Sequence, residues 1–405
     1  MAEKRKPDIR FKGFTDDWEQ RKLGEVAQYR NGKAHENYID DNGKYIVVNS
    51  KFVSTDGEVK KFSNMQNDAL FENEIAFVLS DVPNGRAIAR TFLVEKSDKY
   101  TLNQRIAGIT PLSETHPYYL YILMNRHPYF LAFDDGAKQT NLSVSDVMGF
   151  ESYYPKYKEQ KKIGEYFHNL DNLITLHQRK YDKLINVKKF MLQKMFPQNG
   201  SRVPEIRFTG FMDVWEQRKF GDITEIKSAL RVHKEEWTNT GVPFYRSSDV
   251  MSAINGTTNT KAFISEELYE KLSSTSGKLE KGDVLVTGGG SVGNPYIVPN
   301  NEPLYTKDAD LLWIKNNEKF DSYFVYEFFF SPVFRTYLES ISHVGTIAHY
   351  TITQLADTPI ALPSIEEQKQ IGACFKNLDN LITLHHNKLE KLKKIKKSML
   401  EKMFI

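Results

Sequence analysis

Two long stretches of the chain carry a seam of residues spaced alternately four and three apart. In the first stretch the seam consists of Ile163, Phe167, Leu170, Ile174, His177, Tyr181, Leu184, Lys188, Met191 and Met195. In the second it consists of Ile371, Phe375, Leu378, Ile382, His385, Leu389, Leu392, Lys396, Met399 and Met403. Because a mean spacing of 3.5 residues is typical of a coiled coil, the pattern predicts two long helices. We expect each to be roughly 55 Å long and the pair to pack antiparallel as a rigid spacer.

These two stretches are copies of each other. Residues 159–196 and 367–404 are identical at 25 of 38 positions, and the segment NLDNLITLH occurs in both without a change. A shorter duplication precedes each copy, because residues 7–26 and 204–223 are identical at 13 of 20 positions. Two copies are too few for a solenoid of stacked repeats. The chain is therefore interpreted as a duplicated protein with a pseudo-twofold arrangement.

The segments between the repeats, 27–158 and 224–366, barely resemble each other. Both mix short β-rich runs with helical stretches, and we interpret the aromatic residues of these stretches as core. The expected strands lie in 45–52, 74–80, 283–288 and 309–314, and the helical stretches are 116–133 and 320–341. The prediction is an α+β fold with two globular α/β domains separated by the antiparallel helices. Its segments are 1–158 (first domain), 159–203 (helix and linker), 204–366 (second domain) and 367–405 (second helix).

Composition favours a soluble protein that contacts nucleic acid, if at all, through local clusters. The chain has 40% hydrophobic and 26% charged residues, and it has no run of 18 apolar residues that could span a membrane. The lone cysteine, Cys374, excludes an internal disulfide, so we expect a cytoplasmic protein. Net charge is −1 over 27–158 and −6 over 224–366, and the positive charge lies in the helical repeats. Bulk charge thus makes neither domain a nucleic-acid binder.

The motifs of common enzymes are absent from the sequence or lack their context. GGGSVG at 288–293 matches a dinucleotide-binding fingerprint, but two prolines follow it instead of a helix. The EQK that begins each helical repeat imitates half of a nuclease motif, and we interpret it as helix capping and surface charge. The sequence contains neither a phosphate-binding P-loop nor an HExxH motif. We expect a non-catalytic chain without a metal site.

Clusters of basic, amide and hydroxyl residues recur at corresponding places of the two variable segments. Such side chains form the hydrogen bonds that distinguish guanine from adenine in the major groove of DNA. For any one cluster an ordinary solvated loop is the competing interpretation, but the recurrence favours DNA contact for the set. In the first segment the candidates are Asn49, Ser50, Lys51, Asn84, Arg86, Asn103, Gln104, Arg105, Lys138, Gln139 and Asn141. In the second they are Arg246, Ser247, Ser248, Ser291, Asn294, Thr346, His349 and Tyr350.

The doubled motifs closely resemble the specificity subunit of type I restriction-modification systems. The resemblance covers essentially the whole chain. It rests on P-x-I-R-F-x-G-F-x-x-x-W-E-Q-R-K-x-G at 7–24 and 204–221, and on the EQ-x-x-I-G…NLDNLITLH…ML-x-KMF helices. It implies that each variable segment reads one half of a split site in double-stranded DNA, and that the helices set the spacer. It also implies two methyltransferase subunits and two restriction subunits as partners, which would carry S-adenosylmethionine, ATP and Mg²⁺.

The resemblance places partner docking on the conserved helices. The candidate partner-binding residues are Asn169, Asp171, His177, Lys188, Asn377, Asp379, His385 and Lys396. The polar seam positions among them have two other interpretations, as register-setting residues or as polar edge residues of a partly exposed seam. For the whole chain, the alternatives are a free-standing DNA-binding regulator with two reading heads and a structural adaptor that does not bind DNA.

Overall fold

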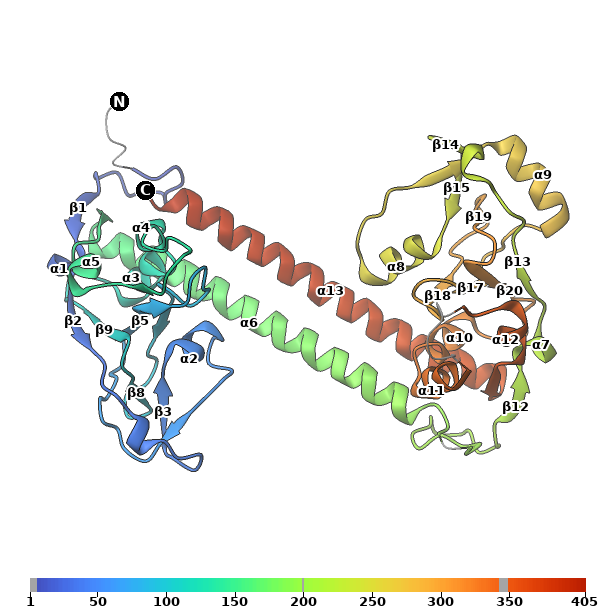
Figure 1. Ribbon diagram of the computed structural model, residues 1–405, viewed down its shortest axis with the longest axis horizontal. Helices are drawn as coiled ribbons and strands as arrows, with labels where there is room; N and C mark the ends of the chain where they lie inside the picture. The colour runs from blue at the N-terminus through green and yellow to red at the C-terminus, as the bar shows by residue number, and fades with distance from the viewer. Residues whose placement is uncertain (1–5, 199, 342–348) are drawn as a thin grey trace. The chain divides into compact units, whose positions relative to one another are not determined.

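A computed structural model of the chain describes residues 6–198, 200–341 and 349–405 (Figure 1). The chain divides into two compact units, Met1–Gln178 with Asn387–Ile405, and Arg179–His386. Each unit contains one globular domain, the first half of the helix that follows it and the last half of the other long helix. The units therefore follow packing, whereas the predicted boundaries at 158, 203 and 366 follow the sequence repeats. The helices of the described residues include none long and apolar enough to cross a membrane.

The first domain is built on two small sheets. One is antiparallel with the order β2-β9-β5-β7, and the other has the order β4-β3-β8, in which β3 and β8 run parallel. Two further strand pairs, β1 with β11 and β6 with β10, complete the domain. The strands are β1 (Glu19–Lys22), β2 (Ala27–Asn31), β3 (Tyr45–Val48), β4 (Phe62–Ser63), β5 (Ile75–Val78), β6 (Ser80–Asp81), β7 (Thr91–Leu93), β8 (Tyr100–Leu102), β9 (Ile106–Pro111), β10 (Thr140–Asn141) and β11 (Glu151–Tyr154). The helices are α1 (Leu23–Val26), α2 (Ser50–Ser54), α3 (Pro117–Met124), α4 (Pro128–Leu131) and α5 (Val144–Met148), with a 3₁₀ turn at Glu36–Tyr38.

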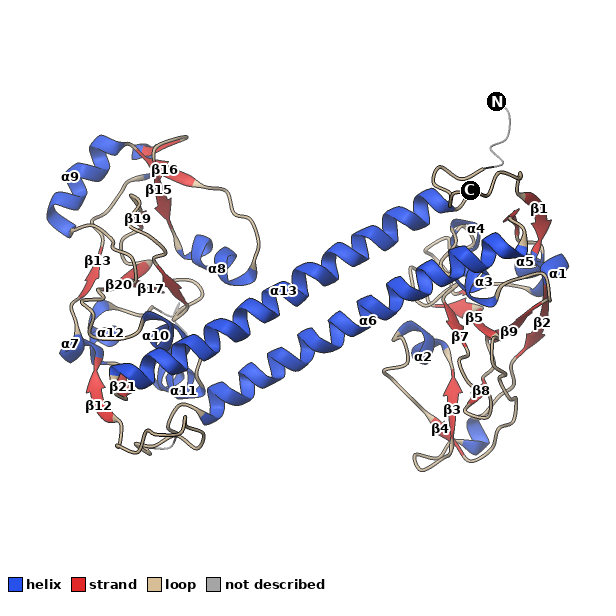
Figure 2. Ribbon diagram, turned by 180° about the vertical axis from the view of Figure 1, so that it is seen from behind, coloured by secondary structure: helices blue, strands red, loops and turns tan. Residues whose placement is uncertain are grey.

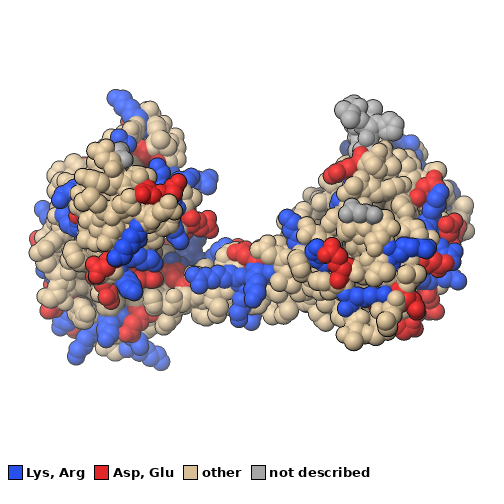
Figure 3. Space-filling model, turned by 90° about the horizontal axis from the view of Figure 1, so that it is seen from below, with Lys and Arg blue, Asp and Glu red and all other residues tan. Residues whose placement is uncertain are grey.

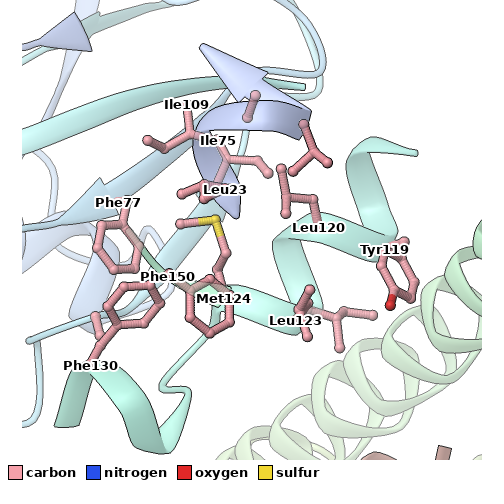
Figure 4. Close-up of a cluster of buried hydrophobic side chains, with 14 of the residues drawn as sticks. Leu23, Ile75, Phe77, Ile109, Tyr119, Leu120, Leu123, Met124, Phe130 and Phe150 are labelled. Carbon is pink, nitrogen blue, oxygen red and sulfur yellow. The ribbon is translucent and has the colours of Figure 1, made fainter. Parts of the chain in front are cut away.

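Aromatic and aliphatic side chains of α3 and α4 form the centre of this domain's core. Figure 4 shows Leu120 and Met124 of α3 beside Ile75 of the antiparallel sheet, with Phe130 of α4 against Phe77. All five side chains are fully buried. The aromatic stretch at 116–133 is thus core, which confirms that prediction.

The second domain repeats this topology with different sequences. Its sheets have the orders β13-β20-β17-β18 and β14-β16-β15-β19, with β15 and β19 parallel, and β12 pairs with β21 (Figure 2). The strands are β12 (Glu216–Lys219), β13 (Ile226–Ser228), β14 (Trp237–Thr238), β15 (Val242–Tyr245), β16 (Ala262–Ile264), β17 (Val284–Thr287), β18 (Pro295–Ile297), β19 (Tyr305–Thr306), β20 (Leu311–Ile314) and β21 (Pro359–Leu362). The helices are α7 (Phe220–Ile223), α8 (Ser247–Asn255), α9 (Glu266–Ser276), α10 (Ser322–Phe328), α11 (Pro332–Ile341) and α12 (Ile352–Asp357), with a 3₁₀ turn at Lys234–Glu236.

The two predicted long helices are α6 (Tyr157–Lys194) and α13 (Ile365–Met403). Every predicted seam residue is buried or half-buried, as a packed helix pair requires. Within the first unit Phe167 contacts Phe404, while Asp171 pairs with Lys396. As numbers rise along α6 the contacted numbers fall along α13, so the segments are antiparallel. The second unit shows the same direction, because Tyr181 contacts His386 and Lys188 pairs with Asp379.

The EQK segment at the start of each long helix has a different role from the predicted one. Glu159 and Glu367 are buried, not surface charges, and each accepts two hydrogen bonds from an arginine of the short repeat. Arg10 holds Glu159 at 2.6 and 2.7 Å, and Arg207 holds Glu367 at the same two distances. At the start of α13, Ser364 Oγ accepts from the N–H of Glu367 at 3.3 Å, while the Glu367 carboxylate is held by Arg207, so only half of a capping box forms. This bidentate pair fixes each short repeat to a helix start, which explains why both motifs recur together.

Candidate nucleic-acid interface and helix faces

Two of the predicted clusters meet at one sheet edge in the first domain. Asn49, Ser50 and Lys51 follow β3, and Asn103, Gln104 and Arg105 follow β8. Since the strands are parallel with Val48 opposite Leu102, their carboxyl ends lie at the same edge. The backbone N–H of Asn103 donates to the carbonyl of Val48 at 3.1 Å. A parallel pair therefore brings together residues that lie more than fifty positions apart.

The clusters at 84–86 and 138–141 are connected to this edge by backbone and side-chain hydrogen bonds. Leu79 donates to the carbonyl of Arg105 at 3.0 Å, and Leu142 donates to the carbonyl of Leu79 at 2.8 Å. Gln139 Nε2 donates to Ser80 Oγ at 2.7 Å, which connects the loop before β10 to β6. On the other side of this loop, Asn84 Nδ2 donates to the carbonyl of Gly136 at 3.3 Å. All four predicted clusters thus lie along one edge of the domain.

The second domain gathers its clusters by the same chain of contacts. Lys307, which follows β19, donates to the carbonyl of Tyr245 at the end of β15 at 2.9 Å. Gly288 donates to the carbonyl of Asp310, and Tyr350 donates to the carbonyl of Gly288, both at 2.8 Å. These bonds correspond to those that join Arg105, Leu79 and Leu142 in the first domain. Ser247 Oγ adds a hydrogen bond of 3.0 Å to the carbonyl of Asp310.

The loop 288–293 requires its glycines for this close packing. A Cβ atom on Gly288 would lie 2.6 and 2.7 Å from two backbone carbonyl oxygens, those of Ala309 and Tyr350. Gly290 has a φ of +72°, which favours glycine. The strand β18 follows the loop in the place where a dinucleotide-binding turn would begin a helix.

The predicted contact residues fall into exposed and structural groups. Tyr350 corrects the prediction, because it is 1% exposed, packs against Phe334 and forms a hydrogen bond with Thr358 through its hydroxyl. Thr346 lies outside the described residues. Asn49 caps α2 by accepting from the N–H of Phe52, and Arg246 is held by Asp249. The exposed candidates are Lys51, Asn84, Arg86, Gln104, Arg105, Lys138, Gln139, Asn141, Ser248, Ser291 and His349.

Residues that shape the loops were missed by the sequence analysis. The carboxylate of Asp81 accepts from the N–H groups of Ala87 and Ile88 at 2.5 and 3.0 Å and so folds the loop 82–88 back on β6. Arg126, which follows α3, donates to the loop 82–88, and Arg335 of α11 donates to the loop 288–294. An acidic residue directly after a buried strand is a signal that could have identified Asp81. The two arginines carry no such local signal.

Several predicted partner-binding residues pair with each other inside the units. Asp171 pairs with Lys396 at 2.6 Å, and its repeat equivalent Asp379 pairs with Lys188 at 2.6 Å. These four residues therefore pair within each helix pair, and their assignment as docking residues stays a prediction. They support the register-setting interpretation, because a slipped pairing would separate the ions. His177 and His385 are half-buried on the seam.

In both α6 and α13, the residues of NLDNLITLH that point away from the seam include two exposed leucines. Leu173 and Leu176 are 44% and 46% exposed, and their repeat equivalents Leu381 and Leu384 are 43% and 45% exposed. Asn169 and Asn377 are exposed and lie four residues before the first leucine, on the same helix face. We call Asn169, Leu173 and Leu176 the α6 face, and Asn377, Leu381 and Leu384 the α13 face. Figure 3 shows basic side chains gathered along the visible part of the helices.

The comparisons with known proteins agree with this arrangement. A family model described as "Type I restriction modification DNA specificity domain" matches residues 15–186 and matches again at 212–394. The chain belongs to this family. The two matches cover most of the sequence and coincide with the duplicated halves.

Relatives in the specificity family match over nearly their whole length. The type I restriction enzyme MjaVIII specificity subunit of Methanocaldococcus jannaschii is 25% identical, with 95% of this chain and 91% of the relative covered. The putative MjaX specificity subunit of the same organism is 22% identical, with 96% and 92% covered. The crystal structure of a type I S subunit from M. genitalium shares the fold, with a TM-score of 0.62, 18% identity and 99% of both chains covered.

One buried acid distinguishes the two units of this specificity-family chain. Glu327 of α10 is fully buried and its carboxylate lies 2.9 Å from Lys188 Nζ, next to Asp379. Burial raises the pKa of Glu327 to about 8 against the opposing effect of Lys188. In the first unit Ile122 occupies the corresponding place. The correspondence follows from Gly164 and Gly372, equivalent glycines that pack on the N–H groups of Tyr119 and Phe324.

Proposed function

We propose that each globular domain reads one half of a bipartite, asymmetric DNA site, within a type I restriction-modification complex. The proposal rests on one observation. The predicted contact loops are arranged in the same way in both domains, at the edge of the sheet where the parallel strand pair ends. In each domain, hydrogen bonds connect the described parts of the predicted loops to the carboxyl end of the parallel strand pair, and in the second domain the last of these loops is described only from His349 onward. The two edges have the same backbone scaffold and different side chains, as two readers of different half-sites require.

The long helices would set the spacer and dock the partners. The α6 face and the α13 face carry the same exposed residues, so two copies of one methyltransferase subunit would find equivalent surfaces. Two restriction subunits would complete the endonuclease. In this scheme the chain itself is non-catalytic and directs adenine methylation and restriction, while its partners hold S-adenosylmethionine, ATP and Mg²⁺.

The proposal is tested by co-expression with the methyltransferase subunit, followed by single-molecule methylome sequencing with and without this chain. We expect methylated adenines in a motif of two specific half-sites around an unspecified spacer. A footprint without the methyltransferase and no methylation with it would identify a free-standing regulator. The absence of both would indicate a structural adaptor.

Two double variants that remove the same number of positive charges test where the first domain binds DNA. Lys51→Gln with Arg105→Gln removes two exposed cations from the carboxyl edge of β3 and β8. Lys44→Gln with Lys99→Gln removes two exposed cations from the residues just before the same strands, at the opposite end. In the complex, the first pair should weaken DNA affinity by about tenfold or more and the second pair should change it little. Equal losses in a fluorescence-anisotropy titration would contradict the assigned edge.

A further inference from the structure

An arginine lies beneath one candidate DNA loop in each domain. Arg126, just after α3, donates from Nη1 to the carbonyl oxygens of Gly85 and Ile88 at 3.4 and 3.2 Å. Its own N–H donates to the carbonyl of Ala89 at 2.8 Å. The guanidinium thus connects the helical layer to the middle and the end of the loop 82–88, which contains two predicted contact residues, Asn84 and Arg86.

Arg335 of α11 makes the corresponding contacts in the second domain. Its Nη1 donates to the carbonyl of Val292 at 3.4 Å and its Nη2 donates to Asn294 Oδ1 at 3.2 Å. Its guanidinium packs over the rings of Phe330 and Phe334, with centroid distances of 5.7 and 5.6 Å. Packing on these two rings restricts the position and orientation of the Arg335 guanidinium next to the loop 288–294.

The two arginines occupy different positions of the repeat. Pro128 and Phe130 correspond to Pro332 and Phe334, so Arg335 aligns with Leu131, and Arg126 precedes the shared proline where the second domain has Phe330 and Ser331. Each domain therefore supplies the same contact from its own site instead of inheriting it from the duplication. Within the described residues, no carboxylate lies at ion-pair distance from either guanidinium, so the loops are the polar partners that both arginines share.

The loops need such a support. The loop 288–294 contains Gly290 and Gly293 with φ of +72° and +76°, and Gly85 lies in the other loop. Glycine gives the loops the turns they require but leaves them with high conformational entropy. A half-buried arginine that bonds two points of a loop reduces that freedom before DNA arrives. Preorganisation of this kind improves recognition without any contact to the bases.

We infer that Arg126 and Arg335 are positioning residues, each of which holds its loop in the conformation that reads one half of the DNA site. The inference rests on the proposed function of the two edges. It predicts that the two arginines act separately, because each contacts a loop of its own domain only. Loss of one should relax recognition of one half-site and leave the other unchanged.

The experiment uses the complex with its methyltransferase subunit and compares Arg126→Gln with Arg335→Gln. Methylation rates are measured on duplexes that carry one base-pair mismatch in either half-site. Each variant should lose about tenfold of mismatch discrimination at one half-site, and the two variants should affect opposite half-sites. The Lys variants should restore only part of it, since lysine cannot bond both points of the loop in a fixed geometry.

Arg207→Gln is the matched control, because it removes another half-buried arginine, one that holds Glu367 and contacts neither loop. It should lower thermal stability without a change at either half-site. Hydrogen exchange gives a second measurement. In Arg335→Gln the amides of Gly293 and Asn294, which donate to Thr287, should exchange faster, while those of Ala87 and Ile88 should not.

The possible outcomes distinguish a failure of the role of the two arginines from a failure of the proposed function. Unchanged discrimination, or equal losses at both half-sites, in variants whose wild type methylates a bipartite motif would overturn the role of the arginines. A wild-type complex that methylates no bipartite motif would instead overturn the proposed function.

Discussion

At the residue scale, the second unit has a buried carboxylic acid, Glu327 of α10, at a place where the first unit has Ile122. Lys188 Nζ lies 2.9 Å from the Glu327 carboxylate and 2.6 Å from that of Asp379, so one lysine faces two carboxylates. Burial of Glu327 disfavours its charged form, and the nearby charge of Asp379 adds to this, so the folded state holds the Glu327 proton to higher pH than the unfolded chain does. The unfolded state releases that proton above about pH 4.5. Stability of the second unit is therefore lost progressively between about pH 4.5 and pH 8, and changes no further above it.

Glu327→Gln tests this linkage. The amide keeps the shape of the protonated acid and cannot ionise, so its advantage over the wild type should increase between pH 5 and pH 8 and then stay constant. The full change is at most about 5 kcal/mol in the free energy of unfolding. Calorimetry of the second unit's transition across this pH range measures it. Glu25→Gln, an exposed carboxylate of the first domain, is the control and should show no such trend. A Glu327→Gln variant whose pH dependence matches the wild type would rule the linkage out.

At the scale of elements, the repeated nonapeptide separates a packed face from an exposed one. Leu170 and Ile174 lie on the seam, while Leu173 and Leu176 point away from it and would be covered by a partner. Leu173→Lys with Leu176→Lys should remove one docking face at little cost in stability, because both residues are exposed. We expect a complex with one methyltransferase subunit instead of two, and roughly tenfold or greater weakening at the altered face.

Native mass spectrometry counts the bound subunits. The reciprocal variant, Leu381→Lys with Leu384→Lys, should give the same stoichiometry, since the α6 and α13 faces are equivalent. Leu112→Lys introduces the same chemistry at a leucine that is 38% exposed in the first domain and serves as the control. Retention of two subunits by either double variant would mean that docking occurs elsewhere.

The sequence was most informative where contacts are local. The four-and-three spacing identified both long helices to within two residues at each start, and alternating β-rich runs placed β3, β5, β17 and β20. What it could not provide depends on non-local pairing. The buried state of Glu159 needs Arg10, which lies 149 residues away, and the burial of Tyr350 needs the core around Phe334. Local composition gives no sign of either contact.

The predicted contact loops also show this difference between local patterns and non-local contacts. Four loop clusters could be listed from their residue types and their recurrence. Their convergence could not, because it depends on parallel pairing of β3 with β8 and on bonds such as that from Leu79 to Arg105. Asn49 and Arg246 illustrate the consequence, since their side chains satisfy a helix start and an aspartate within the domain. Residue type selected loops that the fold connects by hydrogen bonds, while the partners of each side chain decide which polar groups remain available for a ligand.

At the scale of the whole molecule, duplication and divergence have complementary uses. The helices keep the same seam, ion pairs and exposed leucines in both copies, while the domains keep a backbone scaffold and change its side chains. If the helices set the distance between half-sites, their length should be adjustable without a change in what is read. A heptad is the natural unit of change, because it preserves the seam.

Deletion of residues 178–184 from α6 and 386–392 from α13 removes one heptad from each helix. It leaves both ion pairs, Asp171 with Lys396 and Lys188 with Asp379, and both leucine faces intact. Seven residues of helix correspond to about 10 Å, or roughly three base pairs of DNA. Methylome sequencing should therefore report the same two half-sites around a shorter spacer. A spacer of unchanged length would show that the helices do not set it, and altered half-sites would show that specificity is not confined to the domains.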